Sequence, residues 1–155
     1  MTSETDSVTE SLDKPLELEA QLCFALYSTQ LAMSKLYRRL LRELNLTYSQ
    51  YLVMLVLWEE DRRTVSGIGE RLSLDSATLT PLLKRLESAG LLTRRRSRQD
   101  ERQVEIALTQ EGDTLRQKAC EVPIAVEKAT GFSREELKNL RDQLQRLRGQ
   151  LDSGG

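Results

Sequence analysis

Two cysteines, Cys23 and Cys120, are the side chains of this 155-residue chain that could carry redox chemistry through their thiolates. The chain contains no histidine, so the commonest general base and the commonest zinc ligand are both absent. A Ser-His-Asp or Cys-His catalytic site is therefore excluded, and we expect no metal site and no cofactor. Two cysteines do not make a disulfide framework, and a free cysteine is most often a small buried hydrophobic residue.

A second group of chemically useful side chains is basic. Residues 84–102 contain seven lysines and arginines against three acidic residues, a net charge of +4, whereas residues 1–20 carry a net charge of −5. Since the whole chain has a net charge of only −1, this separation indicates one basic face on an otherwise acidic molecule. On charge alone a solvated surface is the simpler interpretation, so the surrounding elements must decide.

These elements follow the order of a helix-turn-helix. A short helix is expected to end at Leu72, and Asp75 is a strong N-cap for a second helix from Ser76 to about Ala89. A helix that enters the major groove with its N-terminus needs small hydrogen-bonding residues in its first turns. Ser76, Thr78 and Thr80 meet this need, and Lys84 lies one turn further on the same face, where it suits a phosphate or a guanine.

A basic β-hairpin is expected directly after these helices. Leu91–Arg94 is short and extended, and Gln103–Leu108 alternates polar and apolar residues as a half-buried strand does. An arginine at the hairpin tip could enter the narrow minor groove, with Asp100 holding the guanidinium of Arg102 by a charge-assisted hydrogen bond. The candidate DNA-binding residues are therefore Asp75, Ser76, Thr78, Thr80, Lys84, Arg94, Arg95, Arg96, Arg98, Asp100 and Arg102.

Longer helices are expected on both sides of this unit. Apolar residues at helical spacing predict one continuous helix over 16–44, and a capping box at Thr47 and Gln50 opens a central, largely apolar helix. After the hairpin, a helix begins at Thr109 and should be kinked by Pro123. A second capping box, at residues 133–136, opens a last helix that carries a stripe of leucines.

The expected fold is mainly α, a winged helix-turn-helix with a two-stranded β-hairpin wing, and its N- and C-terminal helices form a dimerisation region. Residues 1–15 are expected to be a disordered tail, and 16–152 a single domain. Within that domain, dimerisation helices are expected at about 16–44 and 110–152, and the winged helix-turn-helix at about 47–108. Neither a membrane span nor a signal peptide is expected, so the expected location is cytoplasmic.

Residues 48–112 resemble the MarR family of winged-helix regulators. Three segments carry the resemblance: Ser66–Leu74 (SGIGERLSL), Asp75–Glu87 (DSATLTPLLKRLE) and Asp100–Thr109 (DERQVEIALT). The resemblance implies a homodimer that binds a palindromic operator in double-stranded DNA, and repression that a ligand or an oxidant relieves.

Two further segments, Gln21–Tyr27 and Leu46–Leu52, resemble the organic-hydroperoxide-sensing branch of that family. The resemblance implies that Cys23 is the sensor, that Tyr37 and Tyr48 donate hydrogen bonds to its sulfur, and that an organic hydroperoxide is the inducer. Apolar neighbours of Cys23 would admit an alkyl chain.

The step after oxidation stays open. The position of the resolving cysteine in some members of this branch falls on Lys128, and Cys120 lies about two helical turns earlier. Oxidised Cys23 could therefore form a bridge to Cys120, a mixed disulfide with a low-molecular-weight thiol, or an over-oxidised acid.

Two other functions compete with a peroxide sensor. One is a MarR-type repressor released by a small aromatic ligand, bound between the first and second helices without redox chemistry. The other is an enzyme, a thiol peroxidase, which usually has a thioredoxin-like α/β order. The single hairpin among helices argues against that order, so we expect no enzyme.

Overall fold

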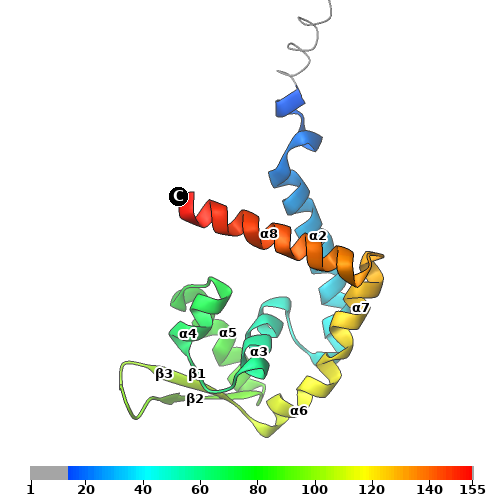
Figure 1. The fold of residues 1–155 in the computed structure, drawn as a ribbon. Coiled ribbons are helices and arrows are strands. Elements are labelled where there is room, and N and C mark those ends of the chain that lie inside the picture. Colours follow the sequence, from blue (N-terminus) through cyan, green and yellow to red (C-terminus); the bar gives the residue numbers. More distant parts are fainter. Residues whose placement is uncertain (1–13, 155) are drawn as a thin grey trace, which may run out of the picture. The chain divides into compact units, whose positions relative to one another are not determined.

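The computed structural model describes residues 14–154 of the chain, which are mostly helical (Figure 1). The predicted disordered tail at 1–15 lies almost wholly outside the described residues. The chain divides into two compact units between Arg39 and Leu40. Its elements in order are η1 (Lys14–Leu16), η2 (Leu18–Ala20), α2 (Leu22–Leu40), η3 (Leu41–Leu44), α3 (Tyr48–Glu59), β1 (Arg63–Thr64), α4 (Val65–Leu72), α5 (Ser76–Ser88), β2 (Leu92–Arg96), β3 (Val104–Leu108), α6 (Gln110–Ala119), α7 (Glu121–Thr130) and α8 (Arg134–Gly154).

The first unit differs from the prediction of one continuous helix over 16–44. Two short 3₁₀ turns precede α2, and the side-chain amide of Gln21 donates to the backbone carbonyls of Pro15 and Glu17. These bonds occupy carbonyls that a continuing α-helix would use, so α2 begins only at Leu22. At the other end, the chain tightens into η3 and stops at Asn45, whose φ of 53° ends the helix as the sequence predicted.

The central helix α3 of the second unit is fixed by the predicted capping box. The Thr47 hydroxyl accepts from the backbone N–H of Gln50 at 3.2 Å, and the Gln50 side chain accepts from the backbone N–H of Thr47 at 3.0 Å. Six of its twelve residues are buried, and it packs against α4, α5 and α6. The helix is therefore the centre of the core, as its apolar sequence predicted.

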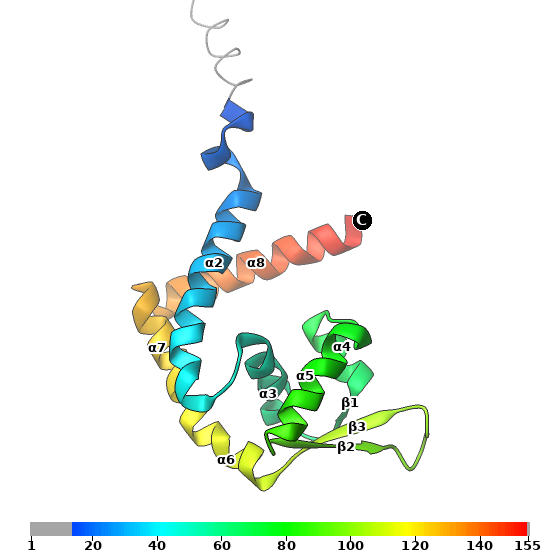
Figure 2. The ribbon, with the colours of Figure 1, turned by 180° about the vertical axis from the view of Figure 1, so that it is seen from behind.

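The helix-turn-helix is formed by α4 and α5, which lie beside α3 (Figure 2). Thr64 caps α4 through the backbone N–H of Gly67 at 3.0 Å, and Asp75 caps α5 through the backbone N–H of Thr78 at 2.7 Å. Between them Ser73 has a φ of 56°, which makes the turn tight. The predicted cap at Asp75 is confirmed.

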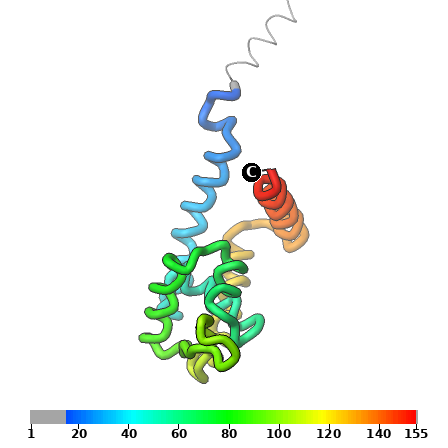
Figure 3. The backbone as a smooth tube through the Cα atoms, turned by 90° about the vertical axis from the view of Figure 1, so that its left-hand side faces the viewer, coloured from blue at the N-terminus to red at the C-terminus, as the bar shows by residue number. Residues whose placement is uncertain are grey.

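The predicted hairpin is confirmed, and it belongs to a three-stranded antiparallel sheet of order β1-β3-β2. Leu92 pairs with Leu108 on one side of the sheet, and Arg63 pairs with Ile106 on the other. The sequence pattern predicts only a turn at residues 61–63, so β1 was not expected. The strand has only two residues, and the carboxylate of Asp61 holds the pairing by accepting the backbone N–H of Leu108 at 2.8 Å. In Figure 3 the tip of the hairpin points toward the reader.

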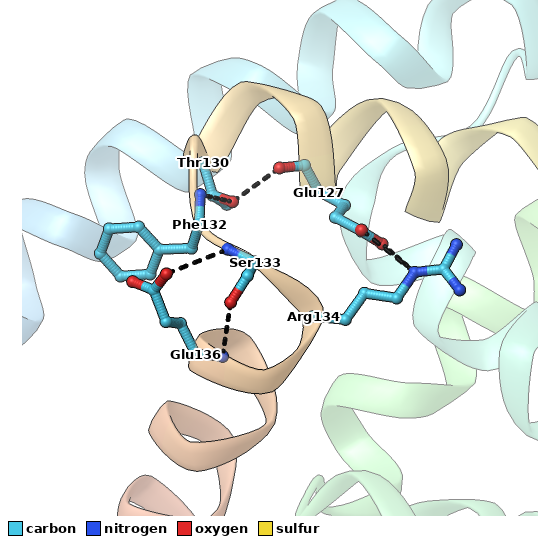
Figure 4. A network of polar contacts seen from close by, with 6 residues as sticks. All are labelled: Glu127, Thr130, Phe132, Ser133, Arg134 and Glu136. Atoms are coloured by element: carbon cyan, nitrogen blue, oxygen red, sulfur yellow. Dashed lines mark hydrogen bonds and ion pairs between the residues drawn. The ribbon is translucent and has the colours of Figure 1, made fainter.

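The C-terminal helices follow from three local signals. Thr109 caps α6 at the backbone N–H of Gly112, as predicted. The helix then breaks at Cys120, three residues before Pro123, since a proline has no N–H for the carbonyl four residues earlier. Figure 4 shows the predicted capping box that opens α8: the Ser133 hydroxyl accepts from the backbone N–H of Glu136, and the Glu136 carboxylate accepts from that of Ser133. Among the described residues, no helix is long and apolar enough to cross a membrane.

Candidate nucleic-acid interface

The start of α5 presents the residues expected to meet DNA. Ser76 and Thr78 are exposed, whereas Thr80 is half-buried and its hydroxyl donates to the backbone carbonyl of Ser76 at 2.7 Å. Thr80 therefore has only acceptor capacity left for a ligand. Lys84, one turn further along the helix, is exposed.

The N-cap of α5, Asp75, has a lowered pKa. Hydrogen bonds from the backbone and the side chain of Thr78 lower the pKa of Asp75 below its ordinary value. The carboxylate thus stays ionised and sits where the helix dipole is positive. Its role in the structure is to set the start of α5, which orients the exposed side chains of the first turn.

A cleft of about 290 Å³ separates α5 from the wing. Its wall combines serine and threonine residues from the starts of the two helices with arginines of the wing, so the structure brings together residues that the sequence placed in separate candidate groups. Sequence reasoning did not assign the contributions of Thr64, Ser66 and Gln103. The residues lining the cleft are Thr64, Val65, Ser66, Ser76, Thr80, Leu83, Arg94, Arg102, Gln103 and Val104.

The arginines of the wing fall into two groups. Arg95, Arg96, Arg98 and Arg102 are exposed, and none of them makes an ion pair with another described residue. Arg94 is half-buried and paired with Glu87, a residue of the last turn of α5 that the sequence analysis did not single out. An acidic side chain seven residues before a strand arginine was the available signal.

The tip of the wing corrects one expectation. Asp100 does not hold the guanidinium of Arg102; its carboxylate accepts the backbone N–H of Arg102 at 3.0 Å. The backbone N–H of Gln103 also donates to the Asp100 carbonyl at 3.0 Å. Asp100 therefore shapes the turn, and the Arg102 side chain projects without an acidic partner in the described residues.

The candidate redox residues are dispersed along the chain. Cys23 is exposed near the start of α2, and Cys120 is exposed at the junction of α6 and α7; both are free thiols. Tyr37 lies fourteen residues after Cys23 on the same helix, which separates the two Cα atoms by about 21 Å. Tyr48 opens α3 and, like Cys120, belongs to the other compact unit. Tyr27, one turn after Cys23, is exposed, and the sequence analysis assigned it no role.

The part of the chain that the structure describes offers no candidate metal centre. No group of three or more cysteine and acidic side chains is placed there to hold a metal ion.

Comparison with known proteins decides the family. The model of the transcriptional regulators SarA/Rot matches residues 35–119. The organic hydroperoxide resistance transcriptional regulator of Bacillus subtilis is 49% identical over 132 residues, which are 85% of this chain and 90% of that protein. This chain belongs to the SarA/Rot and MarR-type winged-helix transcriptional regulators.

Solved structures agree with this assignment. The crystal structure of AbfR of Staphylococcus epidermidis has 36% identity and a TM-score of 0.76, and the match covers 91% of this chain and 97% of AbfR. Reduced AbfR bound to DNA has 37% identity and a TM-score of 0.69, and the match covers 86% of this chain and 94% of that one. These relatives are transcriptional regulators and not enzymes, so the thiol peroxidase hypothesis is rejected.

Proposed function

We propose that this regulator is a cytoplasmic, homodimeric repressor that binds a palindromic operator and releases it when an organic hydroperoxide oxidises Cys23. One observation carries most of the proposal: an exposed cysteine lies on the helix that precedes a winged helix-turn-helix, in a chain half identical to a hydroperoxide resistance regulator. AbfR supports a redox-active cysteine in this family, because it has been solved in reduced, overoxidized and disulfide forms; the reduced and the overoxidized forms were both solved on DNA.

The apolar faces of α2 and α8 support the homodimer. Neither helix buries a single residue completely, although both carry leucines at helical spacing. Leu22 is 58% exposed and Leu26 40% exposed, values that a monomer does not favour for a row of leucines. A second copy of the chain would cover these faces and would place the two copies of α5, the proposed recognition helix, about one DNA turn, ~34 Å, apart.

The dimer also resolves the distance between Cys23 and Tyr37. A phenol about 21 Å away along a straight helix cannot reach the sulfur of the same chain. For Tyr37 to donate a hydrogen bond to Cys23, as the family resemblance implies, it must come from the second copy. The proposed sensor site is then complete only in the dimer, with Tyr48 as the other donor.

The proposed chemistry has two balanced steps. The Cys23 thiolate attacks one peroxide oxygen, the O–O bond breaks, and a sulfenic acid and an alkoxide form; the alkoxide takes a proton and leaves as the alcohol. A second thiol then attacks the sulfenic sulfur, giving a disulfide and water. That thiol is a small cellular thiol or Cys120, since the resemblance places Lys128 at the position of the resolving cysteine that some members of the branch have.

DNA binding is assigned to the winged unit, by which we mean residues 41–122. Ser76, Thr78, Thr80 and Lys84 would meet the major groove, and Asp75 would fix the helix start. Arg102 would enter the minor groove from the wing, with Asp100 shaping the turn beneath it. Arg94, Arg95, Arg96 and Arg98 would contact phosphates.

The test uses purified reduced protein, a palindromic duplex selected by that protein, and a limiting amount of cumene hydroperoxide. We expect release of the duplex together with a mass change on the peptide that contains Cys23. Cys23→Ser should bind the duplex equally well but should not release it, whereas Cys120→Ser should still form the sulfenic acid. Release of Cys23→Ser by the peroxide would contradict the sensor role, and release by an aromatic ligand without a mass change would favour the ligand-responsive repressor.

A further inference from the structure

The contact between Glu87 and Arg94 joins the end of the recognition helix to the wing. The Arg94 guanidinium donates to one carboxylate oxygen of Glu87 from Nε at 3.2 Å and from Nη2 at 3.1 Å. The backbone N–H of Arg94 donates to the other carboxylate oxygen at 3.2 Å. With side chains 28% and 39% exposed, the pair is partly shielded from water, and charge-assisted bonds of this kind fix geometry.

The pairing also fixes which way Arg94 faces. Side chains two residues apart on a strand share a face, so Arg94 lies on the same face of β2 as the buried Leu92. That face is turned toward α5, which packs against β2. A guanidinium has five N–H donors, and Glu87 occupies those of Nε and one of Nη2, so the remaining edge is free to bind another acceptor.

The free donors belong to a residue that lines the cleft between α5 and the wing. The same wall includes Ser76 and Arg102, and none of the residues that line the cleft is acidic. Two arginines and a serine around a cleft of about 290 Å³ match the chemistry of a phosphate diester.

We propose that Glu87 is a positioning residue: it orients Arg94 to bind one backbone phosphate of DNA in this cleft, and it does not touch the DNA itself. The inference rests on the proposed function as a DNA-binding regulator. Arg94 would therefore bind its phosphate in an orientation set by Glu87, whereas the exposed arginines at the wing tip have no described acidic partner that orients them.

The direction in which Glu87→Gln changes DNA affinity distinguishes a positioning role from simple electrostatics. Glu87→Gln removes a negative charge close to a polyanion, and Coulomb attraction alone would then strengthen binding. If the carboxylate orients Arg94, binding should instead weaken by about fivefold, because the charge-assisted pair is lost. A phosphate contact carries no sequence information, so the weakening should be equal on every duplex.

The experiment measures the binding of full-length reduced protein by fluorescence anisotropy, on the palindromic duplex selected by the wild type and on an unrelated duplex of equal length. Glu87→Gln should weaken both by about fivefold, with its thermal unfolding recorded alongside. Arg94→Lys keeps the cation but loses the planar fork, so it should weaken both by a similar factor. The double variant should be no more than about twofold weaker than Arg94→Lys, because both changes break one interaction.

Glu105→Gln is the matched control, because it removes the same charge from the neighbouring strand β3, where Glu105 lies opposite Arg95 but makes no ion pair with any described residue. It should bind as tightly as the wild type or more tightly.

Three results would each overturn the proposal. Glu87→Gln could bind at least as tightly as the wild type, its weakening could be confined to the selected duplex, or the effects could be additive in the double variant. Should Glu87→Gln fail to fold, Arg94→Lys tests the same phosphate contact, and its binding both duplexes as tightly as the wild type would overturn the proposal. If the selection yields no duplex that the wild type binds, the proposed function is refuted, and this inference with it.

Discussion

The winged unit and the two long flanking helices use leucine in opposite ways. Between Leu41 and Val122 the apolar side chains of the helices and strands converge on one core, with Ile68, Leu79 and Ile106 completely buried. Helices α2 and α8 carry as regular an apolar pattern, yet no residue of either is buried. The winged unit therefore has its core within one chain, whereas the flanking helices need another surface, which we propose is a second copy.

The joint between the sheet and α6 shows how tightly the winged unit is packed. The indole N–H of Trp58 donates to the carbonyl of Gly112 at 2.9 Å, and the backbone N–H of Thr109 donates to the carbonyl of Leu91 at 3.1 Å. A Cβ on Gly112 would overlap that Leu91 carbonyl oxygen and press on the Leu108 side chain. Only glycine fits between these elements.

The largest effect is expected from Gly112→Ala. The new methyl group meets backbone atoms that cannot move without breaking the bond to Thr109, so the variant should lose about 3 kcal/mol of unfolding free energy. Urea titration at a fixed protein concentration measures the loss.

Gly149→Ala in α8 is the matched control, because nothing lies within 4 Å of a Cβ at that position. It should raise stability by up to about 1 kcal/mol through helix propensity. If both alanines changed the unfolding free energy equally, the winged unit and α8 would not differ in packing. A large loss of stability from Gly149→Ala would indicate that Gly149 packs closely against the second copy in the proposed dimer.

A smaller effect, on assembly instead of folding, is expected from Leu26→Gln. If α2 is covered by a second copy, the polar side chain should cost about 1–2 kcal/mol in each protomer and raise the dimer Kd at least about tenfold. Sedimentation equilibrium measures the Kd, and far-UV circular dichroism should still show a folded winged unit. Lys35→Gln, on the opposite face of α2, should leave the Kd unchanged. A monomeric wild type would show that no second copy covers α2.

The sequence predicted best where a local signal has one physical solution. The caps at Thr47, Asp75 and Thr109 each pair a short polar side chain with the backbone N–H three residues on, and all three form as expected. The alternation in 103–108 likewise has one solution, a strand with one buried face. These local signals were enough to predict the recognition helix and the wing without any tertiary contact.

The features that the sequence could not predict depend on contacts distant in the chain. The strand β1 exists only because β3 and Asp61 lie beside it, and Gly69 is required because the turn at Leu74 passes too close for a Cβ. Leucine periodicity predicted a helix start six residues before the start of α2, because the hydrogen bonds of Gln21 outweigh periodicity there. The Glu87–Arg94 pair was hidden for the same reason: its partners become neighbours only when β2 folds back along α5.

The smallest effect compares two caps within the winged unit. The pKa of Asp75 is lower in the folded protein, so its contribution to stability is fully present above the unfolded value of about 3.9 and is lost as the pH falls through the folded pKa. Asp75→Asn keeps a capping oxygen but cannot be protonated, so the melting temperatures of wild type and variant should differ by a constant amount above about pH 4 and converge or cross below it.

Thr64→Ala, at the cap of α4, removes a cap that does not titrate and should cost about 1 kcal/mol at every pH. A difference between wild type and Asp75→Asn that stays constant down to about pH 2.5 would show that the Asp75 charge does not stabilise α5. If the difference does depend on pH, the start of the recognition helix is held by a charge, whereas the start of α4 is held by a neutral hydroxyl. Acid should then loosen the proposed DNA-reading end of α5 before it affects the cap of α4.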